Sequence, residues 1–152
     1  MKEFCVIGCG KNKVWDEEPE TGGIVARLAY RGRYFEACRE YVENFYPENW
    51  CILSAKYGFI LPDEIIPGNY DCTFKNTETN PIGAQALSES AGTKKLKEYD
   101  RILVVAGKEY FERTRRAIPQ AVVISVLEGR GPVGKQMQAL KKAVRQNIRM
   151  EV

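Results

Sequence analysis

The chain has 152 residues, of which 44% are apolar and 28% are charged. This length suffices to bury roughly two thirds of the unfolded surface around one core and favours a single domain spanning residues 1–152, while the composition excludes a disordered or fibrous class. The net charge of +3 is too small to establish nucleic-acid binding by itself.

The first half of the chain predicts two strands and two helices. Residues 3–7 are a short apolar run that ends at Gly8, which is typical of a buried strand followed by a tight turn. Apolar residues recur at helical spacing over 24–45 with a break near Gly32, so we expect two consecutive helices, the second ending before Pro47. Residues 50–55 predict the second strand, and a long loop rich in glycine and proline follows it.

The second half predicts two more strands, each followed by a helix. Residues 82–98 are weakly helical, 101–107 are the clearest strand of the chain, and a helix is expected over 108–117. Residues 121–127 predict the fourth strand, and a final helix carries its apolar face on Met137, Leu140, Val144 and Ile148. Alternating strands and helices predict an α/β fold, a three-layer α/β/α sandwich around a short, mainly parallel sheet of about four strands, in the order 2-1-3-4.

The N-terminal apolar run and the cysteines favour a cytoplasmic location. The run in MKEFCVIGCGKNK is too short and too interrupted by charge for a signal peptide or a membrane span, so we expect no membrane association. Five cysteines without a CxxC pair fit reduced thiols better than a disulfide framework.

Three of the predicted strand ends lead into unusual loops, where ligands bind in open α/β sheets. The first loop, GCGKNK at residues 8–13, has glycines that let backbone amides turn toward an anion and two lysines that supply charge. The second, SAKYG at 54–58, offers Lys56 to a phosphate or carboxylate and Tyr57 to a planar group. The alternative for the first loop is an ordinary turn with solvated lysines. The alternative for the second is that its tyrosines only pack the loop against the rest of the domain.

The loop after the fourth strand, GRGPVGKQ at 129–136, nearly matches the phosphate-loop pattern GxxxxGK[ST]. Gln136 stands where that pattern has the hydroxyl residue that holds magnesium. We therefore expect no hydrolysis of nucleoside triphosphates, although the helix N-terminus can still attract an anion.

The absence of histidine limits the possible chemistry. It removes the commonest general base, imidazole metal sites and every Ser-His-Asp or Cys-His arrangement. Neither a metal nor another cofactor is predicted, since no spaced cysteine cluster exists either. Carboxylates such as Asp71 and Glu128 are then the candidates for acid–base catalysis. Cys9, beside two lysines, is a candidate nucleophile, and a purely structural thiol is the alternative.

These segments together resemble a family of uncharacterised prokaryotic domains that carry the SAKYG loop. The resemblance rests on CGKNK at 9–13, YRGRYFEACREY at 30–41, SAKYGFILPDEIIPGNYDCTF at 54–74 and LEGRGPVGKQMQAL at 127–140. More distantly, the SAKYG loop is similar to that of the YaaA-type peroxide-stress proteins, which implies an association with DNA. This chain departs from the pattern because Gly68–Asn69 separates Pro67 from Tyr70.

The loops and the resemblance together predict one site at the carboxyl ends of the sheet. Its residues are Cys9, Gly10, Lys11, Lys13, Ser54, Lys56, Tyr57, Gly58, Tyr70, Asp71, Glu128 and Gly129. The leading hypothesis is that this site binds a nucleotide or nucleic-acid base with its phosphate, with N-glycosidic bond chemistry as a reaction that needs no metal. The alternative is a non-catalytic, nucleic-acid-associated stress or interaction protein. The reaction, the substrate and the oligomeric state stay open.

Overall fold

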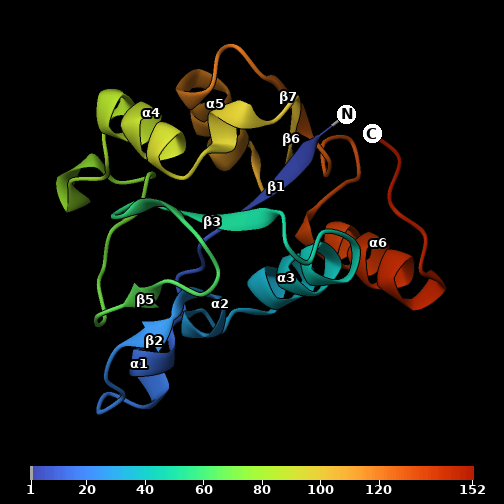
Figure 1. Cartoon of the computed structure of the whole chain (residues 1–152). Helices are drawn as coiled ribbons and strands as arrows, with labels where there is room; N and C mark the ends of the chain where they lie inside the picture. The colour runs from blue at the N-terminus through green and yellow to red at the C-terminus, as the bar shows by residue number, and fades with distance from the viewer. Residues whose placement is uncertain (1) are drawn as a thin grey trace.

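A five-stranded sheet lies at the centre of the structure, a computed structural model that describes residues 2–152 (Figure 1). Four strands are parallel and one edge strand, β4, is antiparallel, giving the spatial order β4-β3-β1-β6-β7. The strands are β1 (Glu3–Gly8), β3 (Trp50–Ser54), β4 (Gly58–Ile60), β6 (Arg101–Val105) and β7 (Val122–Ser125).

Side chains of β1 alternate between two cores, one on each face of the sheet. Cys5 and Ile7 pack into the first core, and Phe4 and Val6 pack into the second. All four are buried, because a strand in the middle of a parallel sheet has helices on both sides.

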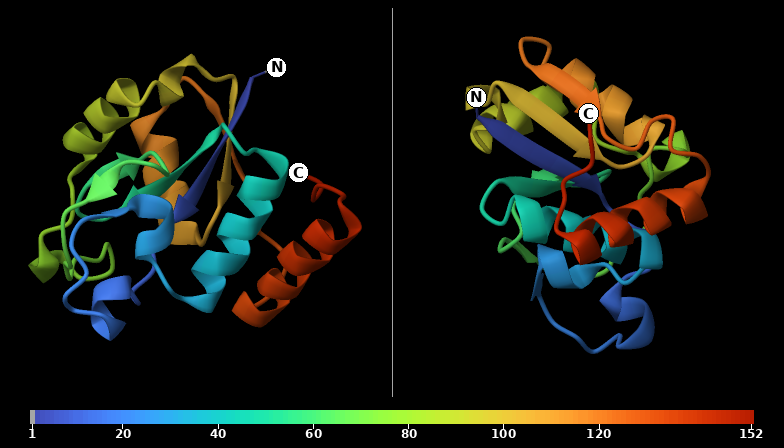
Figure 2. Two further views of the ribbon diagram at one scale, coloured as in Figure 1. Left: turned by 60° about the horizontal axis from the view of Figure 1, so that its bottom comes forward. Right: turned by 90° about the vertical axis from the view of Figure 1, so that its right-hand side faces the viewer.

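Two pairs of helices cover these faces (Figures 1 and 2). The first core includes Tyr41 of α3 and Leu140 of α6, and Figure 2 shows these two helices side by side. The second core includes Leu87 of α4 and Ala117 of α5. The four helices are α3 (Arg33–Phe45), α6 (Val133–Gln146), α4 (Ala84–Thr93) and α5 (Lys108–Ala117).

Most of the shorter elements lie near the carboxyl ends of β1 and β3, and one 3₁₀ turn, directly before β6, lies at the opposite edge of the sheet. A two-stranded antiparallel sheet joins the segment after the first loop to the segment after β4. These elements are α1 (Val14–Glu17), β2 (Ile24–Val25), α2 (Ala26–Ala29), β5 (Ile65–Ile66) and the 3₁₀ turns η1 (Thr77–Thr79) and η2 (Leu96–Glu98). Within residues 2–152, no helix is long and apolar enough to span a bilayer.

The predicted fold class and strand order are confirmed, and three local predictions are wrong. Ile148, expected on the apolar face of the last helix, lies beyond the end of α6 and is exposed. The expected first helix over 24–31 is a two-residue strand followed by one helical turn, because Ile24 and Val25 pair with Ile66 and Ile65. The expected loop after the second strand contains the hairpin strand β4. Its turn depends on Gly58, whose φ of +77° is disfavoured for residues with a side chain.

Candidate functional site

A cleft of about 480 Å³ opens beyond the carboxyl end of β1. It lies between the β1–α1 loop and residues 71–79, and Tyr110 of α5 contributes to its wall. Three lysines and only one carboxylate line it, so its walls carry an excess of positive charge. We call it the basic cleft, and its lining includes Cys9, Lys11, Lys13, Asp71, Lys75 and Tyr110.

Lys13 is the most buried of the three lysines, with 5% of its surface exposed. Its Nζ donates to the carbonyl of Lys11 at 3.2 Å and lies 4.5 Å from the centroid of the Tyr70 ring. None of the ion pairs within residues 2–152 includes Lys13. Its backbone N–H donates to the Asp16 carboxylate at 2.8 Å, which begins α1 and lowers the pKa of Asp16.

Tyr70 belongs to a buried chain of hydroxyl groups beneath the cleft. Its hydroxyl hydrogen-bonds to that of Tyr30 and lies 2.9 Å from Ser54 Oγ. Ser54 Oγ also accepts the N–H groups of Lys56 and Tyr57, each at 3.2 Å, which holds the hairpin turn in place. Burial raises the pKa of both tyrosines, so both remain neutral at physiological pH. Ser54, predicted as a ligand residue, thus lies behind Tyr70 and positions it.

Cys9 lies between β1 and α5 on the cleft wall. The Tyr110 hydroxyl donates to the Cys9 carbonyl at 2.9 Å, and the Cys9 Sγ lies 3.6 Å from that hydroxyl. Since the tyrosine hydrogen is used on the carbonyl, the thiol is the donor in the second contact. Gly8 permits this packing, because a Cβ there would lie 2.8 Å from the Tyr110 ring.

A second hollow of about 350 Å³ adjoins the basic cleft on the other side of the β1–α1 loop. The two share Cys9, Gly10, Lys11 and Tyr110. Tyr34 and Phe35 of α3 form the rest of its aromatic wall. We call this hollow the aromatic recess.

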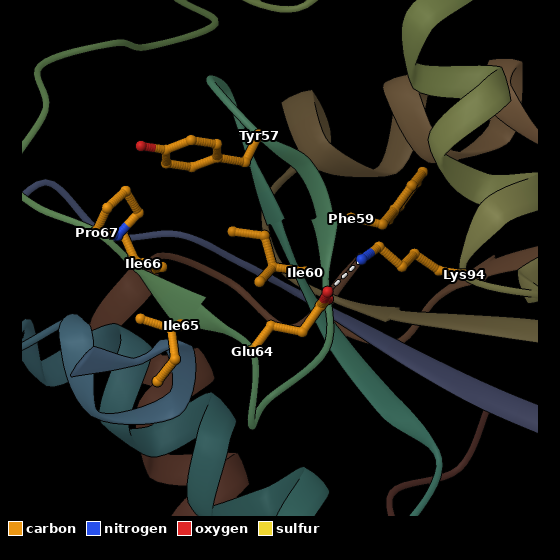
Figure 3. Close-up of a pocket in the computed structure, with 8 residues that line it drawn as sticks. All are labelled: Tyr57, Phe59, Ile60, Glu64, Ile65, Ile66, Pro67 and Lys94. Atoms are coloured by element: carbon orange, nitrogen blue, oxygen red, sulfur yellow. Dashed lines mark hydrogen bonds and ion pairs between the residues drawn. The ribbon is translucent and has the colours of Figure 1, made fainter. Parts of the chain in front are cut away.

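The SAKYG loop lies beside the basic cleft but does not line it. The Tyr57 ring packs edge-on against Tyr70, with 5.3 Å between the ring centroids. It lines another pocket of about 220 Å³, shown in Figure 3 together with the Glu64–Lys94 ion pair. Lys56 is exposed, and its Nζ lies 5.3 Å from the Tyr57 centroid and 5.7 Å from the Tyr70 centroid. Gly58 is buried in the hairpin turn.

Glu128 and Gly129 line a separate hollow of about 210 Å³ beyond β7. Gln136 lies in the same hollow, where its side chain accepts the Tyr34 hydroxyl at 2.6 Å and donates to the Gly131 carbonyl at 3.0 Å. The predicted residues are therefore divided. The basic cleft brings together Cys9, Gly10, Lys11, Lys13 and Asp71. Tyr70 lines an adjoining hollow of about 500 Å³ with Lys11, Lys13 and Asp71, and Ser54 lies behind Tyr70.

Several residues of this region escaped the sequence analysis. Tyr110, Thr73, Lys75, Asn76 and Thr79 line the basic cleft, and all but Tyr110 lie in the polar stretch 73–79. That run of polar residues within a long loop is the sequence feature that could have indicated them. Across residues 2–152, no cluster of three His, Cys, Asp or Glu side chains could hold a metal ion.

Comparison with known proteins identifies relatives over nearly the whole chain. Residues 4–142 match the family of unknown function DUF6884. The chain is 36% identical over 145 residues to the uncharacterized protein YfjM of Bacillus subtilis (strain 168), covering 95% of this chain and 96% of that protein. No solved structure matches it significantly. The match spans the sheet, the basic cleft and most of α6, and the chain thus belongs to the DUF6884 family of unknown function.

Proposed function

We propose that the chain binds a nucleotide, or a related phosphate ester, with its phosphate in the basic cleft. The observation that carries this proposal is Lys13, a lysine that is 95% buried on the cleft wall and forms no ion pair among residues 2–152, although its charge acts on the nearby Asp16 carboxylate.

A buried ammonium group is unfavourable unless other groups compensate its charge. One N–H of the Lys13 ammonium group donates to the Lys11 carbonyl. The face of the Tyr70 ring attracts the ammonium group more weakly. Two of its three hydrogens remain for other acceptors. Lys11 and Lys75 add charge of the same sign, and Asp71 alone opposes it within the cleft. An anion in the cleft would compensate this excess.

The loop backbone supports the same ligand. Among the hydrogen bonds within residues 2–152, none is donated by the backbone N–H groups of Gly10, Lys11 or Asn12. Consecutive N–H groups in a glycine-containing loop are a common way to hold phosphate oxygens. Together with the lysines they favour a phosphate over a smaller anion such as chloride.

Asp71 is the carboxylate placed for N-glycosidic bond chemistry in this proposal. It is exposed on the cleft wall, whereas Glu128 lies in the hollow beyond β7. A carboxylate beside a bound nucleoside phosphate could stabilise charge that develops on the sugar or activate water. Asp71→Asn would then abolish release of the free base and leave binding intact.

Thermal unfolding with added ligand tests the binding proposal. A nucleoside monophosphate should raise the melting temperature of the parent more than chloride at equal ionic strength. Lys13→Met should remove that gain, because methionine keeps the apolar chain and loses the ammonium. Lys56→Met is the matched control, since Lys56 also contacts Tyr70 but lies outside the cleft, and it should respond like the parent. Equal stabilisation by chloride, or a parent-like response of Lys13→Met, would refute the proposal.

Association with nucleic acid is a second candidate, and the resemblance of the SAKYG loop to YaaA-type proteins implies it. One structural observation favours it. Lys135, Lys141, Lys142 and Arg145 are exposed along α6, which contains no acidic residue, and lie on the side opposite the buried Leu140. Charge reversal of Lys141 and Lys142 to Glu should weaken binding to duplex DNA and flatten its salt dependence. Unchanged binding, or none by the parent at low salt, would exclude this candidate.

A further inference from the structure

We infer that the ring of the bound nucleotide stacks in the aromatic recess, against Tyr34 and Tyr110, so that the chain selects ring-bearing phosphate esters over ring-free ones. This inference rests on the proposed function, because it takes the phosphate to occupy the basic cleft.

The two hollows lie on either side of one short loop. Cys9, Gly10, Lys11 and Tyr110 contribute to both of them. A ligand with its phosphate near Lys13 can therefore pass the Gly10–Lys11 segment and reach the recess with its other end. The volumes, about 480 Å³ and 350 Å³, are each of the size of known small-molecule sites.

The aromatic walls of the recess are held in place before any ligand arrives. The Tyr34 hydroxyl donates to Gln136 at 2.6 Å, and that of Tyr110 donates to the Cys9 carbonyl at 2.9 Å. Phe35 is 97% buried, and its Cβ lies 3.7 Å from the position of a Cβ built on Gly10. Rigid aromatic walls reduce the entropy lost when a flat ring binds between them.

The charges at the recess restrict the kind of ring. Lys11 and Arg33 line it, and no carboxylate does. Arg33 has no ion-pair partner within residues 2–152. A cationic ring would be repelled, and a neutral nucleobase is suited to these walls.

Tyr34 and Tyr110 take the stacking role that the sequence predicted for Tyr57. The Tyr57 ring lines the pocket of Figure 3 and does not line the recess. Tyr34 is therefore the specificity-determining side chain in our account.

Calorimetric titration of the parent with AMP and with ribose 5-phosphate tests the inference. Stacking of one base contributes a factor of about 10 to 100, so AMP should bind at least ten-fold more tightly than ribose 5-phosphate. Tyr34→Leu should remove this advantage and leave the affinity for ribose 5-phosphate unchanged. Tyr34→Phe keeps the ring but loses the hydroxyl bond to Gln136, and it should keep the preference for AMP.

The possible failures can be told apart. If the parent binds both ligands with equal affinity, the recess does not hold the ring and only this inference falls. A folded Tyr34→Leu variant that still prefers AMP by the parental factor would also overturn it. If the parent binds neither ligand, the proposed function itself is wrong and the inference falls with it.

Discussion

The ammonium nitrogen of Lys13 lies 4.5 Å from the ring centroid of Tyr70, and the hydroxyl of the same tyrosine lies 2.9 Å from Ser54 Oγ. This pair ties the β1–α1 loop to the segment after β5. The hydroxyl bonds fix the ring, and the ring in turn supports the buried ammonium group at the cleft wall. Replacing Lys13 should therefore mainly affect ligand binding, whereas removing the hydroxyl bonds of Tyr70 should mainly affect stability.

Lys13→Met should increase the free energy of unfolding of the unliganded protein by roughly 1 kcal/mol, because it removes a buried charge whose desolvation is only partly compensated. Urea unfolding monitored by circular dichroism measures this change. Lys75→Met, at an exposed lysine of the same cleft, should stay within about 0.5 kcal/mol of the parent. A loss of more than 1 kcal/mol in Lys13→Met would mean that the lysine stabilises the fold and needs no ligand.

Ser54→Ala should destabilise the protein by about 1–3 kcal/mol, because it leaves the Tyr70 hydroxyl and two hairpin N–H groups without their common partner. Ser88→Ala is the matched control, since the Ser88 hydroxyl makes only an exposed contact with Lys97. Chemical denaturation of both variants gives the comparison. Equal stability of the two variants would show that the buried hydroxyl chain contributes little.

Gly58→Ala should cost about 1–3 kcal/mol of stability, from the positive φ and from a Cβ placed 2.8 Å from Ser90 Oγ. The Ser90 hydroxyl would have to move, and it accepts the N–H of Phe59 at 3.0 Å. Gly68→Ala has open space around the new Cβ and an ordinary φ, so its melting temperature should match that of the parent. A Gly58→Ala protein as stable as Gly68→Ala would contradict the hairpin geometry.

Stability should fall at alkaline pH. Burial raises the pKa of the Cys38 thiol from 9.0 to about 12, and it raises the pKa of Tyr30 and Tyr70 as well. The folded chain therefore keeps protons that the unfolded chain releases. The stabilisation is complete below the unfolded pKa and is lost above about pH 9 for Cys38 and above about pH 10 for the two tyrosines, by roughly 1.4 kcal/mol per pH unit for each group.

Urea unfolding at pH 8, 9, 10 and 11 measures this decline. Cys38→Ala should make it shallower above pH 9 by the contribution of one proton, whereas Cys72→Ala, at a partly exposed thiol, serves as the control. A free energy of unfolding that stays constant up to pH 11 would contradict the assignment of these groups as buried and protonated.

Local patterns predicted the regular part of the fold. The helix expected over 108–117 has those bounds in the structure, and the apolar runs near 3–7, 50–55 and 101–107 are strands in the predicted order. These segments are long enough for burial periodicity to show in the sequence. Strands β2 and β5 have two residues each, too few for any period, and they exist because segments far apart in the chain pair with each other.

Only those parts of the site that are local in the sequence were predicted. The anion-binding features of residues 9–13 are local, and the structure places them together on the cleft wall. The contacts between Tyr30 and Tyr70, and between Tyr110 and Cys9, join residues 40 and 101 positions apart, and no sequence period reveals them. Glu128 follows β7, which is separated from β1 by β6, and so it opens onto a different hollow from Cys9.

A ¹H–¹⁵N NMR titration of the labelled protein with AMP tests the central claim most directly, because it reports where the phosphate ligand binds. We predict that the largest amide shifts fall on residues 9–13 and 71–79, and that Lys13→Met abolishes them at the same ligand concentrations. Shifts confined to the pocket of Figure 3 or to the basic side of α6, or the absence of any shifts at millimolar AMP, would contradict a phosphate site in the basic cleft.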